Sequence, residues 1–522
     1  MNAQGSRSVG CGGCALSRRQ FFATGCAACA AGGSGLLSLG VHAAPGAPAA
    51  AVRPKVRLIF SHLPATNATW PNVGFDYDGR KRELTAGLVN GCPGVEFLPA
   101  TVHTGEEAAR LVKADGDKVD GFLVYALGIW NGSLRAAVAS GKPTLLVDDL
   151  YGGSGEFLIT YSSARREGRK VAAVSSSRFA DVVEAARCFA RVREAGGAEA
   201  FVAACDAARK RATPAPGDSA CTPDKVAFAE PGEVLKRLRE TTILQFGRPM
   251  GLAKPITDVF GTRIISLGFP ELHAAYQKAD KAEAERYADR WITAAARVIE
   301  PKRDEIVKSA QMHLGMTRLM KQYGAAAITV DCLGGFYSGQ LHAYPCLGFT
   351  EMNNAGLVGA CEADLMSTIT MLTLTYLTGR PGYISDPVID TSKNQIIYAH
   401  CVAPTKMFGP KGPANPYHLR NHSEDRKGAV VRSLLPLGYM TSTMEFNAGR
   451  REVLFHQGRA VANVDEDKAC RTKLAVDVKG DIDRLLTFWD HWGWHRVTVY
   501  GDVKPAVEEM ARALKMRFVA EA

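Results

Sequence analysis

The sequence lacks several features that mark common protein classes. No segment reaches the roughly 18 unbroken apolar residues of a membrane-spanning helix. No basic block is interleaved with aromatic residues, although 63 Lys and Arg outnumber 53 Asp and Glu. Because these charges are mixed along the chain, the formal charge of +10 indicates a solvated surface rather than a nucleic-acid face. The zinc motif HExxH is also missing, and the loop "YGGSGEF" is not GxGxxG, so it is weak evidence for a nucleotide site.

The 13 cysteines do not form the pattern of a disulfide framework. Four of them form two CxxC pairs near the amino terminus: Cys11, Cys14, Cys26 and Cys29. This spacing is typical of zinc or iron–sulfur ligands, but we expect the segment that carries it to be removed. The other nine are scattered and odd in number, which favours buried free thiols. Cys205 and Cys221 flank a Pro-containing loop and are the candidate for a disulfide.

The amino-terminal segment has the composition of an export signal. "LSRRQFF" pairs Arg18 with Arg19, and a weakly apolar stretch rich in Ala and Gly follows. "VHAAPGAPAAA" then supplies small residues for cleavage. The pattern predicts a twin-arginine signal peptide over residues 1–44, the twin-arginine export machinery as a partner, and a periplasmic protein. The alternative, a buried amino-terminal helix, is disfavoured by the glycines and the paired arginines.

Strand and helix patterns alternate along most of the remaining chain. From residue 54 to 203, short apolar runs such as "KVRLIFSHL" and "KPTLLVDDL" alternate with helical patterns, which predicts a doubly wound α/β domain. Residues 204–240 have the composition of a linker or insertion, and a second α/β domain is expected over 241–388. Residues 389–522 are rich in strand patterns joined by turn residues, which predicts a C-terminal, mostly antiparallel β domain.

Four polar residues stand in apolar surroundings: Glu362, Asp386, His400 and His495. Glu362 precedes an apolar helix pattern, and the others lie at predicted strand ends. Carboxylates with imidazole suit Mn²⁺ or Mg²⁺ better than four-coordinate zinc. Periodicity alone favours the alternative, in which these groups are helix caps and satisfied core histidines. Asp364 does not share a helix face with Glu362, so we expect it to support the site rather than bind a metal.

Several segments resemble one enzyme superfamily. They include "TVDCLGGF", "GACEADL", "GRPGYISDP", "YAHCVAP" and "GWHRVTVYGDV". These segments resemble the L-fucose isomerase and L-arabinose isomerase superfamily, mainly from Ile328 to Cys401 and from Trp494 to Val503. The resemblance implies a Mn²⁺ ion held by Glu362, Asp386 and His495, with the two carboxylates serving as catalytic acid and base.

The resemblance also implies a substrate, a reaction and an assembly. His400 falls near a further histidine of the arabinose-isomerase branch, and we assign it to substrate binding. Further candidate substrate contacts are Tyr337, His342, Asn353 and Trp494. The implied activity is aldose–ketose isomerisation of a sugar through an enediol, in a homo-oligomer. Alternatives are an epimerase or lyase acting on a modified sugar, and a non-catalytic sugar-binding protein. Trp494 precedes the metal histidine where the fucose-isomerase branch has Asn, and the segment "NPYHLRNHSEDRKG" has no counterpart in that family's substrate-contacting segments.

Overall fold

The computed structural model describes residues 52–217 and 220–522. The predicted signal peptide and its CxxC pairs lie outside the described residues. Among the described helices, none combines the length and apolar character needed to cross a membrane. Residues Arg53–Ala522 form one compact unit.

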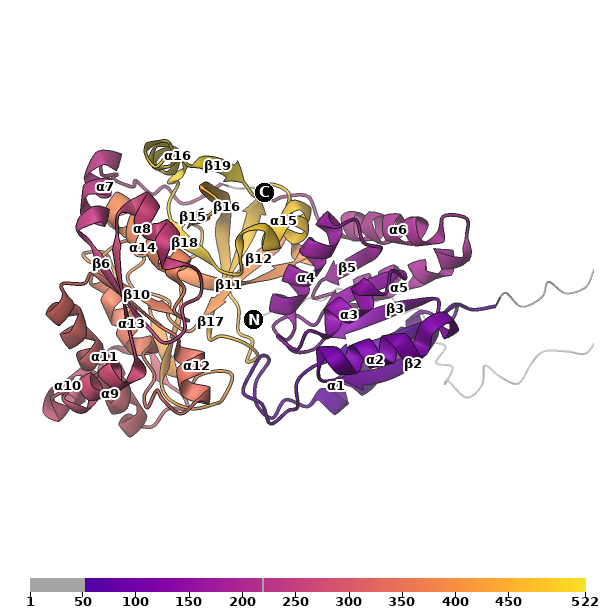
Figure 1. The fold of residues 1–522 in the computed structure, drawn as a ribbon, viewed down its shortest axis with the longest axis horizontal. Helices are drawn as coiled ribbons and strands as arrows, with labels where there is room; N and C mark the ends of the chain where they lie inside the picture. The colour runs from indigo at the N-terminus through magenta and orange to yellow at the C-terminus, as the bar shows by residue number, and fades with distance from the viewer. Residues whose placement is uncertain (1–51, 218–219) are drawn as a thin grey trace, which may run out of the picture. The chain divides into compact units, whose positions relative to one another are not determined.

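The first domain is a parallel sheet with helices on both faces (Figure 1). Its strands run in the order β2-β1-β3-β4-β5 and are β1 (Lys55–Ser61), β2 (Glu96–Val102), β3 (Gly121–Ala126), β4 (Thr144–Asp148) and β5 (Val171–Ser175). Its helices are α1 (Tyr77–Gly91), α2 (Gly105–Asp115), η1 (Gly116–Lys118), α3 (Ser133–Ala139), α4 (Ser154–Arg166), α5 (Phe179–Arg187), η2 (Cys188–Arg193) and α6 (Gly197–Ala212). Alternate residues of β3 face the two cores: Phe122 packs with α3 and α4, and Leu123 packs with α1 and α5. The predicted doubly wound arrangement is confirmed.

A second parallel sheet follows, with the order β10-β9-β6-β7. Its strands are β6 (Thr242–Phe246), β7 (Arg263–Leu267), β9 (Ala327–Val330) and β10 (Val358–Cys361). The helices of this region are α7 (Pro231–Glu240), α8 (Ala253–Phe260), α9 (Phe269–Gln277), α10 (Lys281–Ala294), α11 (Arg303–Tyr323), α12 (Cys332–Tyr337), α13 (Cys346–Asn354) and α14 (Leu365–Thr378). Every residue of α14 except Met366 is buried, which explains why its sequence shows no polar face.

The carboxyl-terminal strands form an antiparallel barrel (Figure 1). The order is β15-β18-β11-β12-β17-β16, and a further pairing of β15 with β16 closes the ring. These strands are β11 (Tyr383–Asp390), β12 (Gln395–His400), β15 (Met440–Asn447), β16 (Glu452–Asn463), β17 (Thr472–Lys479) and β18 (Arg496–Tyr500), with β19 (Arg517–Ala520) parallel to β16. A small sheet joins β14 (Val430–Ser433), β13 (Tyr417–Arg420) and β8 (Arg297–Val298). The remaining helices are η3 (Thr391–Lys393), α15 (Ile482–Phe488), η4 (Trp489–Trp492) and α16 (Lys504–Ala513).

Some boundaries differ from the predicted ones. The barrel strand β11 begins at Tyr383, so Asp386 lies within a strand rather than at its end. Within the predicted linker, the structure has the end of α6 and all of α7. Cys205 is not joined to Cys221 by a disulfide; its buried thiol contacts the carbonyl oxygen of Ala185 at 3.4 Å. Each of these helices buries only one narrow face, so many of its residues are Ala or charged. This composition resembles that of a linker.

Candidate functional site

Glu362 occupies a sharp turn between β10 and α14. Glu362 and Ala363 both adopt left-handed backbone conformations, with φ of 60° and 50°. Such conformations are uncommon for residues other than glycine, and they persist where surrounding contacts enforce them. Here the backbone N–H of Ala363 donates to the Val330 carbonyl, and Asp364 caps α14 by accepting from the N–H groups of Met366 and Ser367. The turn therefore separates two acids with different roles, Glu362 towards a cavity and Asp364 towards the helix.

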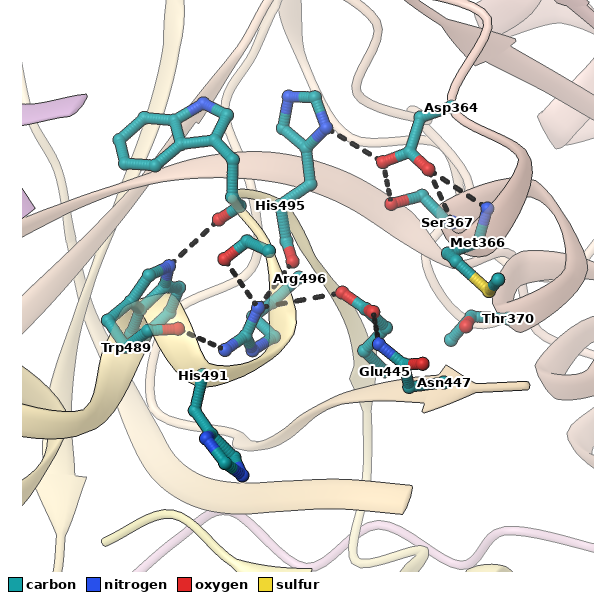
Figure 2. A network of polar contacts seen from close by, with 12 residues as sticks. Asp364, Met366, Ser367, Thr370, Glu445, Asn447, Trp489, His491, His495 and Arg496 are labelled. Atoms are coloured by element: carbon teal, nitrogen blue, oxygen red, sulfur yellow. Dashed lines mark hydrogen bonds and ion pairs between the residues drawn. The ribbon is translucent and has the colours of Figure 1, made fainter. Parts of the chain in front are cut away.

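His495 immediately precedes β18 and is fully buried (Figure 2). Its Nδ1 lies 2.9 Å from Oδ2 of Asp364, which also accepts from the Ser367 hydroxyl. Because a carboxylate can only accept, His495 donates from Nδ1, and in its neutral form the lone pair of Nε2 faces the cavity. Asp364 is thus a positioning residue for His495, as the sequence indicated.

The strand that follows His495 is anchored by a buried ionic network. The guanidinium of Arg496 donates to Glu521 at 2.8 Å and lies 3.5 Å from Glu445. It also donates to the carbonyl oxygens of His495 and Trp489 (Figure 2). A buried Arg is tolerated only when its donors are satisfied, and here they fix the backbone on both sides of the site.

Asp386 and His400 come from the neighbouring barrel strands β11 and β12. The register places Asp386 opposite Ala399, so His400 at the end of β12 lies close to Asp386. The indole N–H of Trp494 donates to Oδ1 of Asp386 at 2.7 Å. The backbone N–H of Cys401 donates to Nδ1 of His400 at 2.9 Å, so a neutral His400 carries its proton on Nε2.

These residues form a cluster suited to a divalent cation. Ligand atoms of Glu362, Asp386, His400 and His495 all lie within 4.8 Å of one another. Nε2 of His495 lies 3.1 Å from Asp386 and 3.6 Å from Glu362, yet it makes no hydrogen bond. A buried imidazole nitrogen without a hydrogen bond, placed between two carboxylates, belongs to a set of donors that suits a divalent cation. The tautomers of the two histidines give them different roles. His495 fits as a ligand together with Glu362 and Asp386, whereas His400 directs an N–H towards Glu362.

The electrostatics of the cluster are strongly perturbed. Burial raises the pKa of Glu362 to about 8; the charge of His495 opposes this shift, and the charges of Asp386 and Glu424 add to it. Burial would lower the pKa of His495, but the charge of Glu362, the hydrogen bond to Asp364 and the nearby carboxylate of Asp386 hold it well above its usual value. The carboxylates around His495 carry an excess of negative charge, which stabilises a divalent cation bound among them.

The cluster opens into an enclosed cavity of about 160 Å³. The first α/β domain contributes Trp70, Ile129 and Trp130 to its wall, and the loop between β13 and β14 contributes His422 and Glu424. Hydrogen bonding to Asp425 and the charges of Cys401 and Glu424 outweigh burial and raise the pKa of His422 to about 9. The cavity wall therefore carries a third carboxyl and a second basic imidazole.

The five predicted substrate contacts lie in different parts of the structure. Trp494 and His400 line the cavity. Asn353 is buried and exchanges two hydrogen bonds with the Gly359 backbone, which links α13 to β10. Tyr337 and His342 line a neighbouring cleft, where the Tyr337 hydroxyl donates to Glu424 at 2.5 Å and His342 contacts the ring of His273. The structure thus brings two of the five to the cluster.

Sequence reasoning did not identify His422 and Glu424. Both lie in "NHSEDRKG", a segment in which charged residues surround a histidine, as in an ordinary solvated loop. Their burial is the distinguishing property, since His422 is 5% exposed and Glu424 is 7% exposed. Periodicity carries no signal for burial in a loop without regular structure.

Comparisons with known proteins give relatives of one kind. A sulfoquinovose isomerase from Clostridium sp. (strain MSTE9) is 25% identical over 311 residues, covering 56% of this chain and 67% of that protein. Sulfoquinovose isomerases from Alkalicoccus urumqiensis and Priestia aryabhattai are 27% and 24% identical, over 28% and 48% of this chain and 33% and 57% of theirs. The chain thus spans from one third to two thirds of the length of these relatives. No family model matches the chain.

A comparison with solved structures adds nothing to this relation. The chain aligns over 53% of its length with 78% of a periplasmic solute binding protein from Actinobacillus succinogenes 130z with bound D-allose, at 12% identity and a TM-score of 0.17. Such a score carries no argument.

The curated relatives define a class of enzyme. The chain is related to sugar isomerases, and these relatives confirm the prediction of an enzyme of the aldose–ketose isomerase type. The narrower resemblance to fucose and arabinose isomerases stays a prediction.

Proposed function

We propose that the chain is a divalent-metal-dependent aldose–ketose isomerase that converts a sugar through an enediol. The observation that carries the proposal is the arrangement of Glu362, Asp386 and His495, with Asp364 fixing the tautomer of His495. Their oxygen and nitrogen donors suit Mn²⁺ or a similar hard ion. When bound, such an ion polarises the substrate oxygens and lowers the energy of a developing oxyanion.

The side chains of the cavity supply the proton transfers. Isomerisation moves a proton between adjacent carbons, so it needs a base that can also return the proton. Glu362 faces the cavity beside Asp386 and His495, which places its carboxylate to take and return this proton. His400 directs its Nε2 proton to the same side, 3.6 Å from Glu362, where it would donate to a substrate oxygen. Trp70, Trp130 and Trp494 line the cavity and give it an aromatic wall.

The cavity wall favours an uncharged sugar. The relatives are named for sulfoquinovose, a sugar whose sulfonate needs a cationic partner. Among the described residues that line this cavity, none is Lys or Arg. The one basic group besides the cluster is His422, and its charge is already paired with Asp425 at 3.1 Å. We therefore include in the proposal that neutral aldoses are better substrates than sulfoquinovose.

The proposal also covers location and assembly. The paired arginines Arg18 and Arg19 support export by the twin-arginine machinery and action in the periplasm. The resemblance to oligomeric isomerases supports a homo-oligomer.

The test uses the full-length protein loaded with Mn²⁺ and incubated in D₂O with a panel of neutral aldoses, ketoses and sulfoquinovose. The proposal predicts aldose–ketose interconversion with solvent deuterium at the transferred position, and loss of both in Glu362→Gln. Tight sugar binding without exchange or conversion would instead identify a sugar-binding protein. Conversion to an epimer or an elimination product would identify the other enzymatic alternatives.

A further inference from the structure

The cavity of the metal cluster has an unusual number of thiols in its wall. Cys332, Cys346, Cys361, Cys401 and Cys470 all line it, and all are buried. Buried cysteine normally behaves as a small apolar residue dispersed through a core. Here five of the described cysteines meet at one polar cavity, and the isomerase proposal gives them no role.

One pair of these thiols is in direct contact. Sγ of Cys332 lies 2.9 Å from Sγ of Cys361, although the residues are 29 positions apart in the sequence. Cys361 ends β10, and Cys332 follows the end of its parallel neighbour β9 by two residues. The contact therefore arises from strand pairing and does not depend on a flexible loop. Only about 0.9 Å separates this distance from the roughly 2.05 Å of a disulfide bond.

The same pair adjoins the metal cluster. Cys361 is bonded directly to Glu362, whose left-handed backbone sets the direction of its carboxylate. A change of position at Cys361 is therefore transmitted to Glu362 through one peptide unit. Cys332 begins α12, whose Leu333 and Phe336 also line the cavity.

The arrangement suits a disulfide better than a second metal site. Metal sites of sulfur ligands need three or four donors converging on one point. In the part of the chain that the structure describes, one group brings three or more His, Cys, Asp or Glu donors within 4.8 Å of one another. It consists of Glu362, Asp386, His400 and His495 and contains no cysteine. The thiols are instead arranged as pairs, since Cys401 and Cys470 share a second side-chain hydrogen bond.

We propose that Cys332 and Cys361 form a reversible disulfide that controls the metal cluster. A small peroxide fits the cavity as oxidant. One thiol is oxidised to a sulfenic acid as the peroxide O–O bond breaks and water leaves. The second sulfur then attacks the sulfenic sulfur, and its proton leaves with the hydroxyl as a second water. Two thiols and one hydrogen peroxide thus give one disulfide and two waters, and a dithiol reductant reverses the change.

The expected consequence is weaker metal binding. Closing the sulfur–sulfur distance displaces Cys361 towards Cys332 and turns Glu362 from its direction towards Asp386 and His495. Displacing the support of a metal ligand typically lowers metal affinity about 10- to 100-fold. The inference rests on the metal cluster of the proposed function but not on the isomerase reaction. Failure of the reduced protein to bind Mn²⁺ would remove the cluster itself, whereas the cross-link and its effect on Mn²⁺ affinity test the disulfide.

The test compares the reduced, metal-free full-length protein before and after one equivalent of hydrogen peroxide. Peptide mapping without reduction should show one cross-linked peptide joining Cys332 to Cys361, lighter by two hydrogens. Calorimetric titration with Mn²⁺ should show affinity reduced at least tenfold, and dithiothreitol should restore it. Cys332→Ser and Cys361→Ser should each keep their Mn²⁺ affinity after peroxide treatment.

A remote thiol pair provides the matched control. Cys188 shares a side-chain hydrogen bond with Cys205 in the first domain, away from the cavity. Cys188→Ser should respond to peroxide as the unaltered protein does. A cross-link between other cysteines, or a Cys332–Cys361 cross-link with unchanged Mn²⁺ affinity, would overturn the proposal. Retention of both free thiols after peroxide would overturn it as well.

Discussion

Asp364 determines which nitrogen of His495 is available to a cation. Its Oδ2 holds Nδ1 at 2.9 Å, and its Oδ1 accepts from the backbone of α14. One carboxylate therefore fixes the orientation of His495 and the start of the buried helix (Figure 2).

We predict that Asp364→Asn lowers Mn²⁺ affinity about 10- to 100-fold. Asn still caps a helix, but its amide can donate to Nδ1 and move the His495 proton to Nε2, which removes the lone pair facing the cavity. Ser367→Ala is the control, because it removes a contact to Asp364 without touching His495. Calorimetric titration of both variants checks this, and equal affinities would contradict the assigned role of Asp364.

Glu424 is the carboxyl of the cavity outside the metal cluster. Burial raises its pKa, and the nearby His422 charge opposes the rise. A buried carboxyl with a raised pKa can exchange a proton with the substrate, so we predict that Glu424→Gln lowers kcat about 10²- to 10⁴-fold while Mn²⁺ stoichiometry stays unchanged. Tyr337→Phe removes only the hydrogen bond to Glu424 and should cost less. A kcat within twofold of the unaltered enzyme in Glu424→Gln would exclude this role.

At the level of single residues, the sequence identified the cluster but not its setting. Glu362, Asp386 and His495 stand out as polar groups in apolar surroundings, which need a partner. That pattern alone favours helix caps and satisfied core histidines, and the resemblance to sugar isomerases is what assigns the three residues to a metal. The 2.9 Å contact of Cys332 with Cys361 and the burial of Glu424 depend on how distant segments meet, and no local pattern encodes that.

At the level of elements, β18 is held by charge as well as by strand pairing. Arg496 at its start and Glu521 just after β19 are both buried and form an ion pair at 2.8 Å. His456 of β16 adds a second contact to Glu521 at 2.9 Å. Through Glu521, these contacts connect the barrel strands β16 and β18 to the chain just after β19, next to His495.

Glu521 should make the stability of the barrel depend on pH. Burial opposes ionisation, but Arg496 and His456 lower its pKa to about 2. Because the folded pKa lies below the unfolded value of about 4.3, the stabilisation is fully present above that value and is lost as the pH falls through about 2. Two pKa units correspond to about 3 kcal/mol.

Urea unfolding of the unaltered protein and Glu521→Gln at several pH values checks this prediction. Gln cannot ionise, so the difference in unfolding free energy should be about 3 kcal/mol near neutral pH and should shrink between pH 4 and 2. A difference that does not change with pH would show that the ion pair is not the cause.

Helices and parallel strands were predicted more accurately than the barrel. The repeated strand–helix pattern specifies a parallel sheet, because its connections are short and local. The barrel closes through the pairing of β15 with β16 and places β11 between β18 and β12, so its order joins segments more than 100 residues apart. Asp386 lies within β11 because residues 386–390 continue the strand by pairing with β12, after residues 383–385 have paired with β18.

At the level of the whole molecule, the cavity joins all the domains. The first α/β domain provides Trp130, whose ring meets Trp494 edge-on at 5.7 Å, and Trp494 in turn donates to Asp386. The second sheet provides Glu362, and the barrel provides Asp386, His400 and His495. We therefore expect substrate binding to depend on the first domain. Metal binding should not depend on it, because all four residues of the cluster come from the second sheet and the barrel.

We predict that Trp130→Ala raises KM up to about tenfold, because an aromatic pair contributes about 0.5–1.5 kcal/mol. Mn²⁺ affinity should stay unchanged, since Trp130 contacts no residue of the ligand set. Val89→Ala removes an exposed apolar side chain of the same domain and is the control. Steady-state kinetics with a substrate found in the D₂O screen measures KM, and calorimetric titration measures Mn²⁺ affinity. A fall in Mn²⁺ affinity in Trp130→Ala would contradict the prediction.

The central claim is that one metal cluster, centred on Glu362, performs proton transfer on a sugar. The most direct test is deuterium exchange between D₂O and a sugar, followed by NMR, for the Mn²⁺-loaded protein and for Glu362→Gln. The account predicts exchange together with aldose–ketose conversion in the unaltered protein and neither in the variant. Equal exchange in both proteins, or exchange that persists after complete removal of divalent metal, would contradict it.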